Sequence, residues 1–400
     1  MHIFIKKLIK YTLGYPLYLI SYLIPRNKKI WLFGNMHGYY DNSKYLFLHT
    51  LNDKKIQCYW ISRDKESIKE LNKKNIPSVY TFSLKGLYLS LRAKVYVYSY
   101  NIEDINFWTS ARTKKINLWH GIGIKKIQSQ ISIGKSSNNF KKSLYNKIVA
   151  PQNFIEPDLF LSTSPLMNKH FADSFQIPQS KIIEANYPRC NILLRDKSEI
   201  IKFIKNNEPN PSLYTFIEDI KNFSSSYLYM PTWRDSGKKN LDNFELSKLN
   251  DFLVSNNKIF YIKLHPNELT NIYFPSNNYS NIRIVDKRID IYLLLPFIDC
   301  LITDYSSIYF DFLVMKNKKI ILYAYDYKEY ITLERDLAFS YDDYMPGVRV
   351  YNQAELLNEL LNEMSYNDVV LSEKLNNIKK IFWSSNNDND YIIQSIKNIL

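Results

Sequence analysis

The sequence contains four short motifs whose side chains suit phosphate chemistry: WHG at 119–121, PTWRD at 231–235, KLHP at 263–266 and TDYSS at 303–307. They carry histidine, arginine, lysine and hydroxyl groups, which bind phosphate oxygens and move protons. Each motif lies at or just after an apolar run that predicts a buried strand. Because open α/β sheets bind ligands at the carboxyl ends of their strands, we expect the motifs to form a site for a phosphorylated substrate.

His120 in the first motif is the main candidate for proton transfer. A neutral histidine is the usual general base for an attacking hydroxyl, and the glycines Gly121 and Gly123 allow the backbone to come close to a ligand. Lys125 and Lys126 follow and are suited to an anionic acceptor. The alternatives are a turn histidine bonded to backbone and two solvated lysines.

The second and fourth motifs suit a diphosphate. Arg234 can hold phosphate oxygens in a two-pronged fork, and we assign Thr232 to the same donor site. Asp304, Ser306 and Ser307 follow a strand and open an expected helix, where free N–H groups and the helix dipole favour an anion. The alternatives are an ion pair of Arg234 with a carboxylate and ordinary helix capping by the hydroxyl residues.

The third motif places His265 and Lys263 at the end of another expected strand. Both can neutralise charge that develops on a departing phosphate, although such a histidine is often only a hydrogen-bonded turn residue. No D-x-D pattern ends a strand, since the one at 388–390 lies in an Asn-rich turn. The three cysteines lie far apart in the sequence. We therefore predict no metal site and no disulfide framework.

The elements that must position these motifs are two series of strands with expected helices between them. Apolar residues recur with helical spacing at 43–51 and 64–71 in the first series and at 290–295, 307–314 and 354–364 in the second. Such alternation predicts an α/β protein with parallel sheets, here two Rossmann-like domains in tandem that meet near residues 200–215. Neither domain has a G-x-G-x-x-G fingerprint or a P-loop, which argues against dinucleotide redox chemistry. The expected strands are 30–33, 56–61, 95–99, 115–119 and 181–184, then 227–230, 258–264, 282–285, 299–303 and 319–323.

The chain is basic, with 53 lysines and arginines against 39 acidic residues and a net charge of +14. This charge favours anionic partners such as a nucleotide, a phosphate polymer or an anionic lipid. The lysines are spread along the chain, and no finger, RNP pattern or basic helix with repeated arginines is present. Nucleic acid is therefore not an expected partner.

Residues 1–27 are apolar and aromatic, with Lys6, Lys7 and Lys10 near the start. Their charge-free stretch at 11–24 has 14 residues, and a spanning helix needs ~20. No small-x-small cleavage site follows. We expect an amphipathic segment that lies in the interface of an anionic membrane. A helix packed on the protein is the alternative.

Taken together, the motifs resemble the CDP-glycerol glycerophosphotransferase family, membrane-associated enzymes that prime or extend teichoic acids and related capsular polymers. The resemblance rests on NLWHGIGIKKI at 117–127, YMPTWRD at 229–235, YIKLHP at 261–266 and the long stretch at 293–330, with PG at 346–347 and a weaker match in DNSKYLF at 41–47. It covers most of residues 28–350, and the order of the motifs is specific to the family.

The resemblance implies a GT-B fold, with two domains facing each other across a cleft. Residues 28–205 would then receive the acceptor, residues 206–385 would bind the CDP-polyol, and residues 386–400 would form a closing helix. It also implies a peripheral enzyme on the cytoplasmic face of the bacterial membrane. The expected partners are CDP-glycerol or another CDP-polyol and a lipid-linked or polysaccharide acceptor, with no obligatory cofactor. The oligomeric state stays open.

The resemblance also implies roles for single residues. His120 would be the general base, while Arg234, His265, Ser306 and Ser307 would bind the pyrophosphate and stabilise departing CMP. The acceptor hydroxyl would attack the β-phosphorus, so that polyol phosphate is transferred.

Two departures from the family pattern bear on this assignment. NYPRCN at 186–191 differs around Arg189, and Gly123 and Ile124 precede Lys125. The polyol and the acceptor are not fixed by the sequence. The rival functions are a GT-B glycosyltransferase that uses a nucleotide sugar and an inactive scaffold of a polysaccharide assembly complex.

Overall fold

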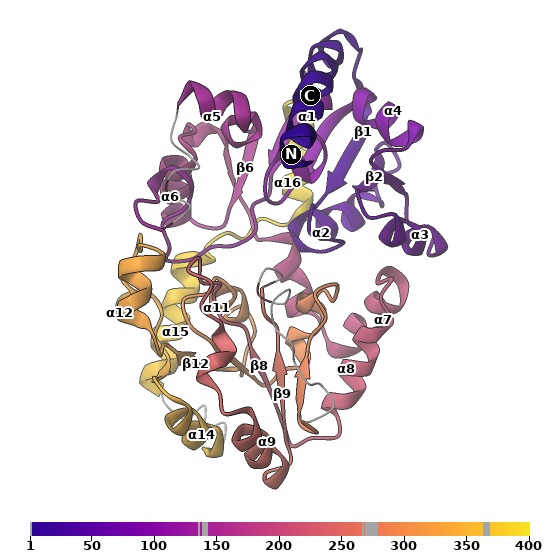
Figure 1. The fold of residues 1–400 in the computed structure, drawn as a ribbon. Helices are drawn as coiled ribbons and strands as arrows, with labels where there is room; N and C mark the ends of the chain where they lie inside the picture. The colour runs from indigo at the N-terminus through magenta and orange to yellow at the C-terminus, as the bar shows by residue number, and fades with distance from the viewer. Residues whose placement is uncertain (1, 135–136, 138–142, 266–267, 269–278, 363–368) are drawn as a thin grey trace.

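The computed structural model describes residues 2–134, 137, 143–265, 268, 279–362 and 369–400. Within them, two parallel sheets lie one above the other, each covered by helices (Figure 1). The side chains of Lys6, Lys7 and Lys10, and residue Pro266 of the third motif, lie outside the described residues.

The first sheet has the strand order β3-β2-β1-β4-β5-β6-β7, and all of its pairs are parallel. Its central strands β1 and β4 consist largely of buried β-branched, aromatic and leucine residues, as a sheet covered on both faces requires. The strands are β1 (Asn27–Gly34), β2 (Gln57–Ser62), β3 (Ser78–Tyr80), β4 (Ala93–Tyr98), β5 (Lys114–Asn117), β6 (Leu159–Ser162) and β7 (Ile182–Glu184). The helices are α2 (Asp41–Thr50), α3 (Lys65–Lys73), α4 (Leu84–Arg92), α5 (Leu144–Val149) and α6 (Pro165–Phe175). The next helix, α7 (Lys197–Asn207), lies with the helices of the second sheet (Figure 1).

The second sheet has the order β10-β9-β8-β11-β12-β13 and is also wholly parallel. Both faces of this sheet are packed. Successive residues of a strand point to opposite faces, and here they belong to two separate clusters of buried side chains, one on each face. The strands are β8 (Ser225–Tyr229), β9 (Lys258–Ile262), β10 (Ile282–Ile284), β11 (Cys300–Thr303), β12 (Lys319–Tyr323) and β13 (Val348–Val350). The helices are α8 (Ser212–Ile220), α9 (Leu246–Ser255), α11 (Ile308–Phe312), α12 (Tyr327–Glu329), α13 (Tyr341–Tyr344), α14 (Gln353–Leu361) and α15 (Val369–Phe382).

The expected strands are all present, and the alternation of strand and helix is confirmed. Three strands were not expected, namely β3, β6 and β13, and each has only three or four residues. The helix expected at 290–295 is instead two 3-10 turns, η9 (Ile291–Leu293) and η10 (Leu295–Phe297). Pro296 explains this difference, because it lacks an N–H and disfavours helical backbone in the residue before it.

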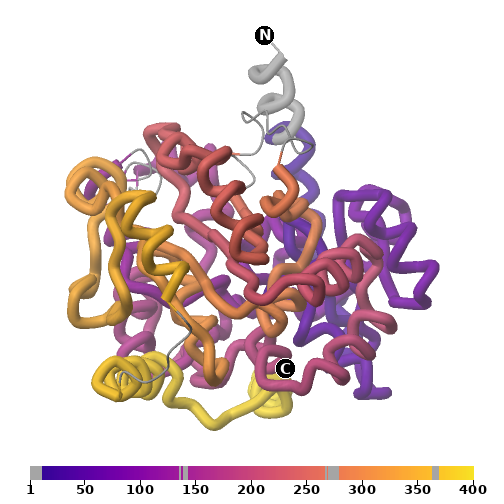
Figure 2. Tube along the Cα trace, turned by 90° about the horizontal axis from the view of Figure 1, so that it is seen from below, coloured from indigo at the N-terminus to yellow at the C-terminus, as the bar shows by residue number. Residues whose placement is uncertain are grey.

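The end of the chain returns to the first sheet. α16 (Asn389–Asn398) packs against α2, and Lys397 forms an ion pair of 2.6 Å with Asp53. The yellow segment in Figure 2 runs along one edge of the molecule from α15 to α16. Both halves of the chain are thus connected at two places, near α7 and again after α15.

The first helix, α1 (His2–Leu23), packs one face on the protein. Gly14 touches the ring of Trp108, since a Cβ there would lie 2.6 Å from ring carbons. Tyr15 contacts the same ring edge-on at 5.0 Å, and its hydroxyl donates to the carbonyl of Ile148. The opposite face is exposed, with Leu13 at 69% and Leu23 at 81%.

Among the helices of the described residues, none combines the length and apolar character needed to cross a bilayer.

Candidate active site between the two sheets

The first and fourth motifs meet where the two sheets face each other. Gly121 follows β5, and Ser307 follows β11. A Cβ added to Gly121 would lie 2.9 Å from the Ser307 Oγ, and one added to Gly123 would lie 3.6 Å from the Ser307 Cβ. Glycine at 121 therefore permits a contact that a side chain would obstruct, and the two sheets bring the first and fourth motifs to one place.

His120 is oriented by its neighbours on the first sheet. Its Nδ1 lies 3.2 Å from the carbonyl oxygen of Ser99, and its ring stacks on Tyr100 at 3.9 Å. Because a carbonyl only accepts hydrogen bonds, Nδ1 carries the proton and Nε2 keeps its lone pair. Burial lowers the pKa of His120 to about 3, more than the bond to Ser99 raises it. His120 is therefore a neutral imidazole with a free Nε2 near neutral pH.

Two more histidines share this neighbourhood. His37 and Lys125 each lower the pKa of both His120 and His265 through their charge, although burial is the larger cause for both. His265 is exposed, and its ring lies 5.7 Å from that of Trp233. Three imidazoles and an ammonium group thus gather between the sheets.

His37 was missed by the sequence analysis. It is exposed and meets the ring of Tyr100 edge-on at 4.6 Å, on which His120 also stacks. The signal was present, because MHG at 36–38 follows β1 in the same way that WHG follows β5. Because His37-Gly38 also follows a strand, the pattern that made His120 a candidate for proton transfer applies to His37 as well.

The two lysines after the first motif have different surroundings. Lys125 lies close enough to Asp304, Arg234 and Asp235 to feel their charges, and burial as the largest cause lowers its pKa to about 8. Lys126 instead forms an ion pair of 2.8 Å with Asp336. The structure therefore brings Lys125 to the phosphate motifs and leaves Lys126 in a contact between loops of the two halves.

Arg234 lies inside the second half, where a fork that holds phosphate oxygens was expected. Its side chain is fully buried, with Nε and Nη2 donating to Asp326 at 2.8 Å and Nη2 donating to Asp304 at 2.9 Å. Its Nη1 donates to the carbonyl of Thr232 at 2.6 Å. As placed, Arg234 joins the second and fourth motifs, and its direct contact with phosphate stays a prediction.

Asp304 is similarly occupied. Its carboxylate accepts from the backbone N–H of Thr232 at 2.9 Å and of Tyr305 at 2.6 Å, besides Arg234. The hydroxyl of Thr232 is buried and has no hydrogen-bond partner among the residues that the structure describes, so one polar atom of the expected donor site is unused. Asp304 thus fixes the loop from within, while Thr232 keeps a free hydroxyl.

Ser306 and Ser307 are half-buried at the loop that precedes α11. Ser307 makes no capping hydrogen bond to α11, which has only five residues. A helix this short adds little dipole, so the anion-binding capacity of the loop rests on its hydroxyls and N–H groups. The ordinary-cap alternative is thereby disfavoured for Ser307.

Lys263 points away from this loop. Its Nζ donates to the carbonyl of Asp286 at 2.6 Å and to that of Ile289 at 3.3 Å. Burial lowers its pKa to about 8. The structure therefore gives Lys263 a bracing role between β9 and the segment that follows β10, and its contact with phosphate stays a prediction.

Two buried cations at the junction of the halves were not assigned a role from sequence. Lys44 of α2 pairs with Glu208 at 2.7 Å and with Asp290 at 2.8 Å. Arg189 lies in η7 (Pro188–Leu194) and is 2% exposed. DNSK at 41–44 and NYPRCN at 186–191 were visible as motifs, but nothing in the sequence indicates which distant carboxylates they meet.

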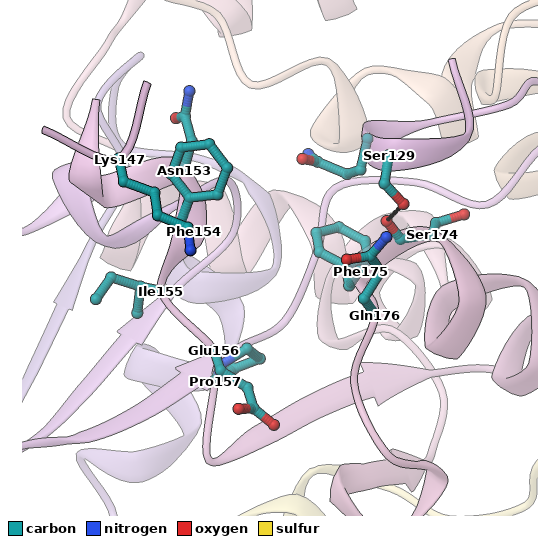
Figure 3. Close-up of a pocket in the computed structure, with 11 residues that line it drawn as sticks. Ser129, Lys147, Asn153, Phe154, Ile155, Glu156, Pro157, Ser174, Phe175 and Gln176 are labelled. Atoms are coloured by element: carbon teal, nitrogen blue, oxygen red, sulfur yellow. Dashed lines mark hydrogen bonds between the residues drawn. The ribbon is translucent and has the colours of Figure 1, made fainter. Parts of the chain in front are cut away.

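A cavity of about 230 Å³ lies apart from this site, between α5 and the end of α6 (Figure 3). Its labelled wall includes Lys147, Asn153, Ser174 and Gln176, and none of the four motifs contributes to it. Within the described residues, no group of His, Cys, Asp and Glu side chains is arranged to hold a metal ion.

The sequence profile of the family described as CDP-Glycerol:Poly(glycerophosphate) glycerophosphotransferase matches residues 17–395. The chain belongs to this family. A teichoic acid glycerol-phosphate transferase of Staphylococcus aureus is 29% identical over 371 residues, which cover 89% of each chain. A teichoic acid glycerol-phosphate primase of Bacillus subtilis is 26% identical and covers 79% of this chain and 77% of the primase.

Among solved structures, the wall teichoic acid polymerase TagF superposes with a TM-score of 0.76 at 19% identity, over 99% of this chain and 98% of that one. This likeness confirms the α/β fold with parallel sheets expected from sequence. The chain spans 46% of a teichoic acid poly(glycerol phosphate) polymerase of Bacillus subtilis to which it is 26% identical. This member of the glycerophosphotransferase family thus matches only part of some longer relatives.

Proposed function

We propose that this protein transfers glycerol phosphate, or a related polyol phosphate, from a CDP-activated donor to a hydroxyl of a growing surface polymer and releases CMP. One observation carries the proposal within this family: His120, neutral and with Nε2 free, lies on the loop that touches Ser307 of the opposite sheet. A proton acceptor and a phosphate-binding loop then face the same reacting group.

In the proposed reaction, the acceptor oxygen forms a bond to the β-phosphorus of the donor. His120 Nε2 takes the proton of the attacking hydroxyl. The bond between the β-phosphorus and the oxygen bridging to the α-phosphate breaks, and that oxygen leaves on CMP. Ser306 and Ser307 donate hydrogen bonds to the phosphates, and His265 and Lys125 offset the charge that develops on the departing group.

The experiment that tests this function measures CMP release from CDP-glycerol and CDP-ribitol, next to a panel of UDP- and GDP-sugars, with a membrane extract as acceptor. We expect CMP from one CDP-polyol only when acceptor is present, and about 10²- to 10⁴-fold less CMP release with His120→Ala. Release of UDP or GDP would mean a glycosyltransferase on the same fold. Release of no nucleotide would refute the proposal.

We also propose that the protein acts at the cytoplasmic face of the membrane as a peripheral protein, where a lipid-linked or polysaccharide acceptor is held. The exposed face of α1 supports this, with Leu13, Leu19 and Leu23 each more than 60% exposed. α5 lies beside α1 and adds Leu144 and Tyr145, which are 77% and 71% exposed. Neighbouring exposed apolar side chains of this kind suit the headgroup region of a bilayer.

Co-sedimentation with vesicles that contain anionic lipid tests this location. Changing Leu13, Leu19 and Leu23 to Asn should release the protein from the vesicles while leaving α1 packed on Trp108. The matched control changes three exposed apolar residues of the second half to Asn. They are Val254, Leu333 and Leu361, which are 50%, 66% and 54% exposed. Equal sedimentation of both triple variants and the unchanged protein would contradict the membrane proposal.

A further inference from the structure

The loop that carries His120 is held by its backbone carbonyls. Asn42 Nδ2 donates to the carbonyl oxygens of Leu118 at 3.2 Å and Trp119 at 2.9 Å. Arg189 Nη1 donates to the carbonyl oxygen of His120 at 2.9 Å. Three successive carbonyls at the reacting residue are therefore fixed by two side chains from other parts of the chain.

This loop has a backbone conformation that needs such support. Trp119 has a φ of 52°, in the left-handed region that bulky residues rarely occupy. Its ring is buried against Phe160 and Phe175, the latter at 4.7 Å edge-on. A conformation of this kind persists only where the surroundings impose it, and here they direct the next residue, His120, towards the opposite sheet.

Arg189 is itself held from both halves of the molecule. Its Nη1 pairs with Asp41 at 2.6 Å, and its Nη2 pairs with Asp311 at 2.7 Å. Asp41 and Asn42 begin α2 on the first sheet, whereas Asp311 lies in α11, directly after Ser306 and Ser307. One guanidinium thus contacts the carbonyl of the base and the helix that follows the phosphate loop.

We propose that Arg189, together with Asn42, is a positioning residue of the glycerol-phosphate transfer. The pair sets the direction of His120 and keeps it in register with the loop at 303–307. Neither side chain touches the substrate in this role. The inference rests on the proposed function, because it assigns a purpose to the placement of His120 as a base.

The test compares Arg189→Lys and Asn42→Ala with a matched variant, Arg26→Lys. Lysine keeps the charge of Arg189 but has no rigid fork that reaches both carboxylates and the carbonyl. Asn42→Ala removes the two bonds to carbonyls and the bond that Asn42 Oδ1 accepts from the backbone N–H of Arg189 at 3.3 Å, and it removes no charge. Arg26 also donates to backbone carbonyls, those of Ser90 and Ala111, in the same half of the molecule.

The measurements are kcat and KM in the CMP-release assay and binding of CDP-glycerol by calorimetry. We expect kcat to fall about 10- to 100-fold for Arg189→Lys and Asn42→Ala, since small misplacements of reacting groups cost up to about 100-fold. KM for CDP-glycerol and its binding should change less than about threefold. Arg26→Lys should turn over as the unchanged protein does.

A second measurement separates positioning from general structural support. In a His120→Ala background, Arg189→Lys and Asn42→Ala should lower the residual turnover no further, since they act through a residue already removed. Equal losses in both backgrounds would overturn the inference, and so would unchanged kcat in both single variants. If His120→Ala itself left turnover intact, the base role of His120 would fail and the inference with it. The proposed function fails only if no CDP-polyol releases CMP, which distinguishes the two failures.

Should Arg189→Lys not fold, Asn42→Ala decides the question alone, because the ion pairs of Arg189 remain. Loss of CDP-glycerol binding in Asn42→Ala in proportion to the loss of kcat would also overturn the inference, since a positioning role for the base leaves the donor site unchanged.

Discussion

Two buried arginines serve the two halves of the molecule in different ways. Arg234 is fully buried and pairs with Asp304 and Asp326, both of which belong to the second half. Arg189 is also buried, but its partners Asp41 and Asp311 come from different halves. The same arrangement, one guanidinium between two carboxylates, thus stabilises one half of the molecule in one case and joins the two halves in the other.

The difference lies in what else each guanidinium reaches. Arg234 donates its remaining hydrogen bond to the carbonyl of Thr232 and so supports the second and fourth motifs from within the second half. Arg189 donates its remaining hydrogen bond to the carbonyl of His120, the residue that we propose takes the proton. Stability should therefore depend most on the Arg234 cluster. The Arg189 cluster should affect turnover but not the binding of the donor.

The largest expected effect concerns His120, whose carbonyl is bonded to Arg189 and not to Arg234. His120→Ala should lower turnover by about 10²- to 10⁴-fold, the range that a general base supplies. Binding of CDP-glycerol, measured by calorimetry, should stay within about threefold, since the donor motifs lie on the other sheet. Equal losses of turnover and nucleotide affinity would remove the distinction between the two arginine clusters.

The next effect concerns stability. Arg234→Met should lower the free energy of unfolding by about 3–5 kcal/mol, because Asp304 and Asp326 would stay buried without a counter-charge. Urea denaturation measures it, and donor binding should weaken as the loop at 303–307 loosens. As a control, Arg335→Met breaks a partly exposed pair with Asp235 and should cost about 1 kcal/mol or less. Equal urea midpoints for the two variants would show that Arg234 does not hold the domain together.

These clusters mark the limit of what the sequence predicts. Local patterns suffice for most strands, because apolar runs such as 30–33 and 258–262 are visible in the sequence. Length alone does not explain why β3, β6 and β13 were not expected, since β7 and β10 have only three residues and were expected. The rule that ligands bind at strand ends also brings the first and fourth motifs together correctly.

Long-range pairing is beyond such patterns. Asp326, which pairs with the buried Arg234, follows β12 and lies 92 positions further along the chain. Nothing near Arg234 in the sequence indicates that its side chain turns inward. Arg189 likewise meets residues 41 and 311, which only the packed sheets bring together. His37 is different, since its His-Gly signal was local and was overlooked.

Lys125 lies close to the cluster of Arg234 and Asp304 and offers a pH-dependent test. Burial, partly offset by Asp304, lowers its pKa to about 8, so it is cationic at pH 7 and mostly neutral at pH 9. The KM for CDP-glycerol should therefore rise about tenfold between these values, the worth of a charged hydrogen bond. Lys125→Met should abolish this rise.

Lys263→Met is the control for this measurement, because the pKa of Lys263 is also lowered to about 8 while its ammonium is bonded to the carbonyls of Asp286 and Ile289. It should leave the pH dependence of KM unchanged. If Lys263→Met flattened the profile and Lys125→Met did not, the assignment of the two lysines would be reversed.

The smallest expected effect tests which histidine the Arg189 cluster serves. The loop of His37 is fixed by a different residue, because Asp104 accepts from the N–H of Met36 at 3.2 Å, and also from those of Ser99 and Tyr100. His37 is exposed and only touches the edge of Tyr100. His37→Gln should therefore lower kcat by less than about tenfold, below the range of a general base.

His49→Gln is the matched control, since the ring of His49 in α2 is hydrogen-bonded to Asp390 of α16, and it should not change turnover. A loss of about 100-fold or more in His37→Gln, with His120→Ala still active, would make His37 the base. Arg189 would then hold a loop that takes no part in proton transfer, and its bond to the His120 carbonyl would serve only to align the two halves, as Arg234 aligns the motifs within one.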